Sequence, residues 1–301
     1  MSKNKSYKIF RESFLYNLIC GTIFSAFALI CIFPFYHLLI STISDSQFVE
    51  QGRIYLFPVG LTLNNYIEVL RIPNLGNAAF ISISRTILGT SGTVFVTSYL
   101  AYFFTKTNMW GRKFWYRLVV ATMYFSAGLI PSFLNNRMLG LHNNFLIYIV
   151  PGLVGVFNMV LVKTSIEAMP AEIEESVIMD GAGYLTRYFR IVLPLQIPIL
   201  ATIAVFSAVG HWNDFFTTQL YITRPQLFTL QFLLFEFLNQ VRQAMRQIDT
   251  AAEGMGMAGN VLRPASVRLT LTAVVTIPIL LVYPFMQKYF VKGIMVGAIK
   301  G

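Results

Sequence analysis

Residues 13–44 read SFLYNLICGTIFSAFALICIFPFYHLLISTIS, a run without a single Asp, Glu, Lys or Arg. A membrane-crossing helix needs about 20 predominantly apolar residues, so this run is long enough to span a bilayer. Five further stretches meet the same test, over residues 86–105, 118–136, 138–162, 191–213 and 269–287. The sequence therefore predicts an all-α, polytopic membrane protein with six transmembrane helices.

The composition favours the same class of protein. Hydrophobic residues make up 55% of the 301 residues and charged residues only 12%, about half the ~25% of an ordinary soluble domain. The formal net charge is +10, but the Lys and Arg residues lie at the edges of the apolar runs and not on one soluble face. This placement argues against nucleic-acid binding and is typical of a membrane protein.

The basic residues also predict the orientation of the chain. With six spans both ends share one side, and 14 of the 23 Lys and Arg residues fall on that side. Because cytoplasmic loops carry the excess of positive charge, both termini are predicted to be cytoplasmic. The expected organisation is a cytoplasmic N-tail (1–12), a six-helix membrane domain (13–289) with a long cytoplasmic loop (163–194) and a long outer loop (215–268), and a cytoplasmic C-terminal tail (290–301).

The cytoplasmic loop departs most from the rest of the chain, since it holds five of the thirteen acidic residues. Pro170 reads as the start of a helix with acidic residues in its first turns, where negative charge suits the helix dipole. Gly181 and Gly183 permit a sharp break. A second short helix is expected near Tyr184, with Leu185, Tyr188, Phe189 and Val192 on one face, and it leads through Pro194 into the fifth span. Such a unit is either a solvated loop or a segment that lies in a groove of another protein.

The fixed positions of this loop resemble a known motif. Glu175-Ser-Val-x3-Gly181-x9-Ile191-x-Leu193-Pro194 has the spacing E-A-A-x3-G-x9-I-x-L-P of the EAA loop in permease subunits of ABC import systems, with Ser176-Val177 in place of two alanines. Over most of its length the chain is similar to the carbohydrate-uptake branch of these type I permeases, such as the second membrane subunit of the maltose importer. The stretches 125–131, 139–141, 212–214 and 287–301 share in this similarity.

The resemblance implies a coupling mechanism. In the family this loop docks into a separate cytoplasmic ATPase, and closure of two ATPases around ATP moves the membrane helices between inward-facing and outward-facing states. The coupling residues implied here are Glu175, Ser176, Asp180, Gly181, Ala182, Gly183, Phe189, Ile191, Leu193 and Pro194. The C-terminal tail is expected to reach the ATPases through Lys292, Gly293 and Lys300, or alternatively to lie near anionic lipid.

The same resemblance implies the partners. The chain has no G-x4-G-K-[ST] phosphate loop, so ATP and Mg²⁺ are expected on the ATPases, and this chain is expected to be a non-catalytic subunit without cofactor or metal. The expected partners are a homologous second permease subunit, two ATPase subunits, an extracytoplasmic solute-binding protein and membrane lipid. The expected function is import of an oligosaccharide or polysaccharide fragment across the bacterial cytoplasmic membrane.

Direct contact with the substrate is harder to predict from the residues. Sugars stack on aromatic faces and pair their hydroxyls with amides and carboxylates. The candidates near the middle of the membrane or its outer side are Tyr124, Phe133, Asn136, Asn158, Trp212 and Asn213. The alternative role of each is in helix packing or in the interfacial belt.

Arg85 is the one basic residue within a plausible span. It is either a functional charge inside the membrane or an interfacial side chain that reaches water. Asp214, at the outer end of the fifth span, is either its partner or the first residue back in water. A permease for a non-sugar solute is an alternative function, and a polytopic membrane enzyme is disfavoured because no carboxylate in a span pairs with Arg85, His37 or His211.

Overall fold

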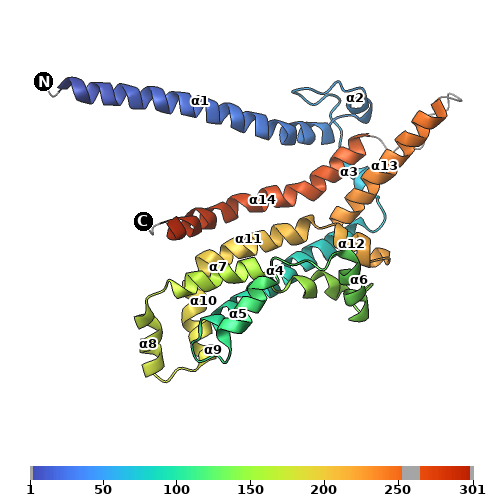
Figure 1. The fold of residues 1–301 in the computed structure, drawn as a ribbon. Helices are drawn as coiled ribbons and strands as arrows, with labels where there is room; N and C mark the ends of the chain where they lie inside the picture. Colours follow the sequence, from blue (N-terminus) through green and yellow to red (C-terminus); the bar gives the residue numbers. More distant parts are fainter. Residues whose placement is uncertain (1–2, 253–264, 299–301) are drawn as a thin grey trace. The chain divides into compact units, whose positions relative to one another are not determined.

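The computed structural model describes residues 3–252 and 265–298, and this part of the chain is helical without strands. The elements in order are α1 (Lys3–Thr42), α2 (Ser46–Glu50), α3 (Asn64–Leu70), α4 (Leu75–Thr105), α5 (Arg112–Ala121), α6 (Leu129–Met138), η1 (Phe145–Tyr148), η2 (Val150–Gly152), α7 (Val156–Glu167), α8 (Ala171–Met179), α9 (Tyr184–Arg187), the π-helix η3 (Tyr188–Val192), α10 (Leu193–Leu195), α11 (Ile197–Asn213), α12 (Phe216–Tyr221), η4 (Pro225–Leu227), α13 (Leu230–Ala252) and α14 (Ala265–Ala298) (Figure 1). They form two compact units, residues 1–72 with 241–274 and residues 73–240 with 275–301.

In the first unit, a buried amide ties the end of α1 to α3. The side-chain nitrogen of Asn65 donates to the carbonyls of Thr42 (3.0 Å) and Ser44 (2.7 Å), and the Thr42 hydroxyl lies 2.8 Å from that of Tyr66. The apolar stretch Phe14–Thr42 of α1 has no buried residue in its most apolar window within the described part of the chain.

In the second unit, α4, α7 and α11 lie side by side and form the core (Figure 1). Fully buried side chains from these helices include Met159, Val162 and Ile203. Close approach depends on small residues, because a Cβ at Gly89 would lie only 2.5 Å from Nε2 of His211. Small residues at such contacts are typical of helix packing in membranes.

The described residues contain three helices long and apolar enough to cross a membrane, in Phe14–Thr42, Leu75–Thr105 and Ala265–Val282. Two bent pairs raise this number to five if each pair is one span. They are Phe145–Gly152 with Val156–Glu167, bent by 46°, and Tyr184–Leu195 with Ile197–Asn213, bent by 80°. Five of the six predicted spans thus correspond to a helix or a bent pair.

The remaining predicted span, residues 118–136, is not one continuous helix. Helix α5 ends at Ala121, α6 begins at Leu129, and Gly128 between them has a φ of 87°. An uncharged run does not show such a break, because the sequence test measures apolar length and not backbone continuity. The count of six spans stays a prediction.

One other expectation changes in the structure. The second span starts at Leu75 and not at Thr86, because the charge of Arg85, which ended the uncharged run, is compensated within the fold.

Candidate functional site

The predicted break in the loop of residues 163–194 is a helix C-cap centred on Gly181. Helix α8 ends at Met179, and Gly181 has a φ of 75°, a conformation that favours glycine. The amide of Gly181 donates to the carbonyl of Ile178 (2.9 Å) and that of Ala182 to Val177 (3.2 Å). These two bonds form a Schellman motif, which explains the sequence Asp180-Gly181-Ala182 by backbone geometry.

Helix α8 has no buried residue. Glu175, Ser176 and Asp180 are exposed, and the apolar side chain of Met179 is 87% exposed. In Figure 1, α8 lies with α9 and α10 at one end of the α4, α7 and α11 bundle. The short helix after the turn adds Leu185, which is also exposed. The unit therefore presents a mixed acidic and apolar surface outside the core.

The second helix of the loop is predicted to have one apolar face, but the structure divides its four side chains. Tyr188 and Val192 are buried in the core, whereas Leu185 and Phe189 are about half exposed. The reason is the π-helix Tyr188–Val192, whose wider turns rotate the side chains away from ordinary α-helical spacing.

A sharp elbow connects this loop to α11. The chain bends by 80° between Leu195 and Ile197, and Pro194 on the preceding turn has no amide hydrogen to continue the helical bonding. The buried side chain of Gln196 sits in the elbow, accepting from the Ser165 hydroxyl (2.5 Å) and donating to the Met169 sulfur (2.9 Å). Of the predicted coupling residues, Ile191 and Leu193 are partly buried here and Pro194 is exposed.

Glu174 in the first turn of α8 is the centre of a charged cluster. Its carboxylate accepts hydrogen bonds from Nζ of Lys106 and from Nη1 of Arg187, the latter at 3.2 Å. The Lys106 ammonium also lies 4.0 Å from the centroid of the Tyr102 ring. Burial lowers the pKa of Lys106, and the hydrogen bond and charge of Glu174 offset this only in part. Through this cluster, the exposed helix α8 is held to the end of α4.

Tyr188 anchors the loop from the other side. Its side chain is 1% exposed, and its hydroxyl lies 2.6 Å from that of Ser98 on α4. Its ring contacts those of Tyr99, Tyr102 and Phe189 at centroid distances of 5.3, 5.4 and 5.0 Å. The loop is thus attached to α4 by a buried hydrogen bond and an aromatic cluster as well as by charge.

At the other end of the bundle, Arg85 and Asp214 form an ion pair. Nη2 of Arg85 lies 2.6 Å from Oδ2 of Asp214, and Nη1 donates to the Asp214 carbonyl at 2.8 Å. The guanidinium stands 4.3 Å from the centroid of the Tyr148 ring. Burial raises the pKa of the Asp214 carboxyl, but hydrogen bonds from Thr217 and the charge of Arg85 outweigh it, so the pKa lies below its ordinary value. The interpretation of Asp214 as the partner of Arg85 is confirmed.

The six candidates for the substrate path are not gathered in one place. Phe133 stacks on Tyr221, and the Asn136 amide donates to the Tyr221 hydroxyl at 2.9 Å. Asn213 accepts a hydrogen bond from Gln231 at 3.2 Å. These contacts connect the three residues to neighbouring elements, and their place in the substrate path stays a prediction.

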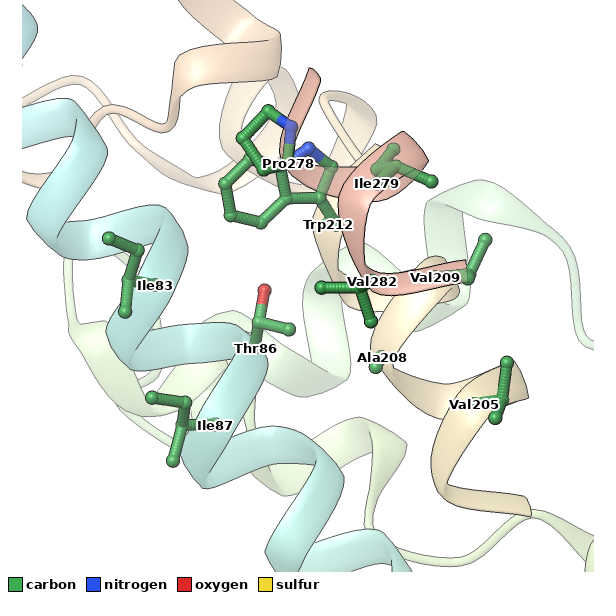
Figure 2. A pocket seen from close by; sticks show the side chains of 10 residues that line it. All are labelled: Ile83, Thr86, Ile87, Val205, Ala208, Val209, Trp212, Pro278, Ile279 and Val282. Carbon is green, nitrogen blue, oxygen red and sulfur yellow. The ribbon is translucent and has the colours of Figure 1, made fainter. Parts of the chain in front are cut away.

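The other three candidates, Tyr124, Asn158 and Trp212, have different surroundings. Tyr124 is 75% exposed, and Asn158 lines a cavity of about 320 Å³. The Trp212 indole donates to the Val275 carbonyl at 3.0 Å and lines an apolar cavity of about 200 Å³ with Ile83, Thr86, Ile87, Val205, Ala208, Val209, Pro278, Ile279 and Val282 (Figure 2). Because the walls of this second cavity are almost entirely apolar, it cannot pair the hydroxyls of a sugar.

The predicted contact residues of the C-terminal tail have side chains outside the described part of the chain. Lys292 and Gly293 belong to α14, whose side chains beyond Val282 are not described, and Lys300 lies outside the described residues. The role of the tail stays a prediction.

A family model described as binding-protein-dependent transport system inner membrane component matches residues 94–296, about two thirds of the chain. The chain belongs to this family. The polygalacturonan/rhamnogalacturonan transport system permease protein YtcP of Bacillus subtilis (strain 168) is 33% identical over 95% of this chain and 99% of its own length. Protein LplC of the same organism is 35% identical over 94% of each chain.

A solved structure supports the same family membership. A chain of a bacterial ABC transporter involved in the import of the acidic polysaccharide alginate matches with a TM-score of 0.81 and 28% identity, covering 93% of this chain and 98% of that chain. The all-helical architecture is therefore the type I permease fold of ABC importers.

Sequence reasoning missed several residues that hold the loop of this inner membrane component in place. Glu174, Lys106, Arg187 and Gln196 are all polar residues that the fold buries in part or in full. The only local signal was the excess of acids at the start of the predicted helix. Their partners could not be predicted, because they lie 13 to 68 positions away along the chain.

Proposed function

We propose that this inner membrane component is the translocating subunit of an ATP-driven importer, and that α8, the Gly181 turn and α9 form its docking segment for a separate ATPase. The observation that carries this proposal is an exposed helix–turn–helix unit, fixed to α4 by Glu174 and Tyr188 and continuous through its elbow with α11. A force applied to the unit would reach two core helices at once.

The docking surface consists of the exposed side chains at the motif positions of the unit, from Glu175 onward. Glu175, Ser176 and Asp180 supply polar contacts, and Phe189 supplies an apolar one. Gly181 and Ala182 shape the turn, Gly183 starts the second helix, and Ile191, Leu193 and Pro194 form the elbow. ATP and Mg²⁺ bind to the partner ATPases and not to this chain. Both termini and this unit face the cytoplasm, in keeping with the basic residues on that side.

The proposed cargo is an oligosaccharide or polysaccharide fragment. The support is that YtcP is named for polygalacturonan and rhamnogalacturonan, and that the matched structure is of an alginate importer. The remaining partners are a second, homologous permease subunit and an extracytoplasmic binding protein that delivers the sugar.

The proposal is tested in proteoliposomes that contain the assembled transporter with its ATPases and binding protein. Glu175→Ala should reduce both the ATPase activity stimulated by the loaded binding protein and the uptake of labelled galacturonate oligomers. Glu172→Ala, an exposed acid on the same helix outside the motif, is the matched control. Equal activity of the two variants would refute the docking role. Uptake of other solutes but of no sugar would refute the proposed cargo.

A further inference from the structure

A basic and aromatic segment follows α4 in the second unit. Residues 106–118 read KTNMWGRKFWYRL, with four basic residues and no acid. The whole stretch between Glu68 and Glu167 is without Asp or Glu. The chain turns at Gly111, which has a φ of 63°, and enters α5. The basic residues of this segment therefore have no acidic neighbour along the chain.

The fold provides partners for two of the four basic residues. Lys106 pairs with Glu174, and Nη1 of Arg112 donates to the last carbonyl of α4 at 3.0 Å. Lys113 and Arg117 are exposed, and neither forms an ion pair with any side chain that the structure describes. Because they lie four positions apart on one helix, their charges repel each other. An anion between them would remove this repulsion.

Apolar side chains lie beside these two cations. Trp110, just before α5, is 84% exposed, and Phe114 on α5 is 63% exposed. Phe114 and Leu118 are four positions apart, so they form a row next to that of Lys113 and Arg117. A surface that combines Lys and Arg with Trp and Phe is typical of the boundary between lipid and water.

The neighbouring helices place this surface at the edge of the membrane. Helix α4, Leu75–Thr105, is long and apolar enough to cross a bilayer and ends directly before the segment. The apolar run Leu118–Ala121 then leads the chain back toward hydrocarbon. The ring of Tyr116 packs on that of Phe104 at 5.6 Å, which fixes the inner side of α5 to the bundle core. The opposite side is left at the depth of the lipid head groups.

We propose that Lys113 and Arg117 bind the phosphate of an anionic phospholipid, with Trp110 and Phe114 at the adjoining apolar boundary. Ammonium and guanidinium groups both donate to phosphate oxygens, and a cationic surface attracts anionic head groups. Lipid fits this surface better than a soluble partner protein does, because the apolar row continues into the run 118–121. The inference concerns attachment to the membrane and does not depend on the proposed cargo or on the ATPase contact.

A fluorophore beside the site tests the proposal. Asn108→Cys, at an exposed position of the turn, is labelled with bimane in an assembled transporter whose other cysteines are serine. Nanodiscs contain phosphatidylglycerol or phosphatidylcholine that carries a doxyl quencher at the head-group end of its acyl chain. We expect the phosphatidylglycerol to quench several-fold more strongly. In Lys113→Gln/Arg117→Gln this ratio should fall close to one.

Two control variants separate a site from general charge attraction. Arg137→Gln/Arg224→Gln removes as many exposed cations from the same unit, outside the segment, and should keep the preference for phosphatidylglycerol. Lys113→Arg/Arg117→Lys keeps both charges and should keep the preference as well, which shows that the charges and not the exact side chains are required.

Four outcomes would overturn the lipid site. They are equal quenching by the two lipids in the parent, an unchanged preference in Lys113→Gln/Arg117→Gln, a loss of preference in Arg137→Gln/Arg224→Gln as large as in that variant, and a loss in Lys113→Arg/Arg117→Lys. A bimane that neither lipid quenches until the ATPases are removed would identify the ATPase as the occupant instead. Transport is not needed for this measurement, so failure of the proposed function leaves its result unaffected.

Discussion

The carboxylate of Glu174 on helix α8 pairs with the ammonium of Lys106, the residue that follows helix α4. The two residues are far apart in sequence, and each is partly shielded from solvent. The pair therefore fixes the exposed loop to a core helix by a route separate from the covalent path through Pro194. In the proposed docking segment, this second attachment holds α8 to the core.

Glu174→Gln removes the charge but keeps the size of this side chain. Ion pairs of this partly exposed kind are worth up to ~1 kcal/mol, so we expect a modest loss of thermal stability and a several-fold lower uptake per ATP hydrolysed. The comparison is with Glu172→Gln, an exposed acid two residues earlier on the same helix. If both variants couple ATP hydrolysis to uptake as well as the parent does, Glu174 has no role in transmitting motion.

Gly181→Ala places a Cβ on a residue with a φ of 75°. The left-handed conformation costs roughly 1–2 kcal/mol for a residue with a side chain, so the Schellman turn should open. Hydrogen exchange of the Ala182 amide, which bonds to Val177, reports this directly. In Gly183→Ala the backbone has an ordinary φ of −69°, and the same amide should stay protected. Unchanged exchange in Gly181→Ala would refute the strained-turn explanation.

Gly89→Ala tests the close contact between α4 and α11. Its new Cβ would approach His211 to 2.5 Å, so the helices must move apart, and overpacking of this kind costs about 1–3 kcal/mol. Thermal unfolding in detergent should show the loss. Gly76 lies on the same helix with nothing within 4 Å of a Cβ, and Gly76→Ala should cause no loss. Equal unfolding temperatures for the two variants would contradict the packing seen here.

The hydrogen bond between Tyr188 and Ser98 can be measured with a double-mutant cycle. Tyr188→Phe and Ser98→Ala each leave one hydroxyl without this partner, and each should cost ~1–3 kcal/mol of stability. The double variant should cost less than the sum of the two, because neither hydroxyl is then left unpaired. Strict additivity would indicate that the two hydroxyls do not interact.

The Arg85 and Asp214 pair predicts a dependence of stability on pH. Because the pKa of Asp214 is lower in the folded chain than its ordinary value, the pair stabilises the fold above that ordinary value, near 4, and the contribution is lost as the pH falls through the lowered pKa. Asp214→Asn should be less stable at neutral pH and lose less on acidification. Parallel unfolding curves for parent and variant between pH 3 and 7 would exclude this contribution.

The features that the sequence could predict are local ones. The long uncharged runs indicate helices of membrane-spanning length, and the acidic first turn and glycines of residues 171–183 predict a helix that ends at a turn, as seen at Gly181. Each depends on residues within a few positions of one another. The same reasoning did not show the interruption within residues 118–136, which only the backbone reveals, and it misjudged the face shared by Leu185 and Tyr188, which the π-helix divides.

The amino-acid sequence by itself determined that the chain is helical and apolar, and where the loop of residues 163–194 turns. Only the tertiary structure decided which charges meet. Glu174 and Lys106 are 68 positions apart in the sequence, and Arg85 and Asp214 are 129 positions apart. Each pair forms because the packed helices bring its two residues together. The physical reason is that removing a charge from water is costly unless a partner is near, and the identity of that partner depends on the packing of the whole bundle.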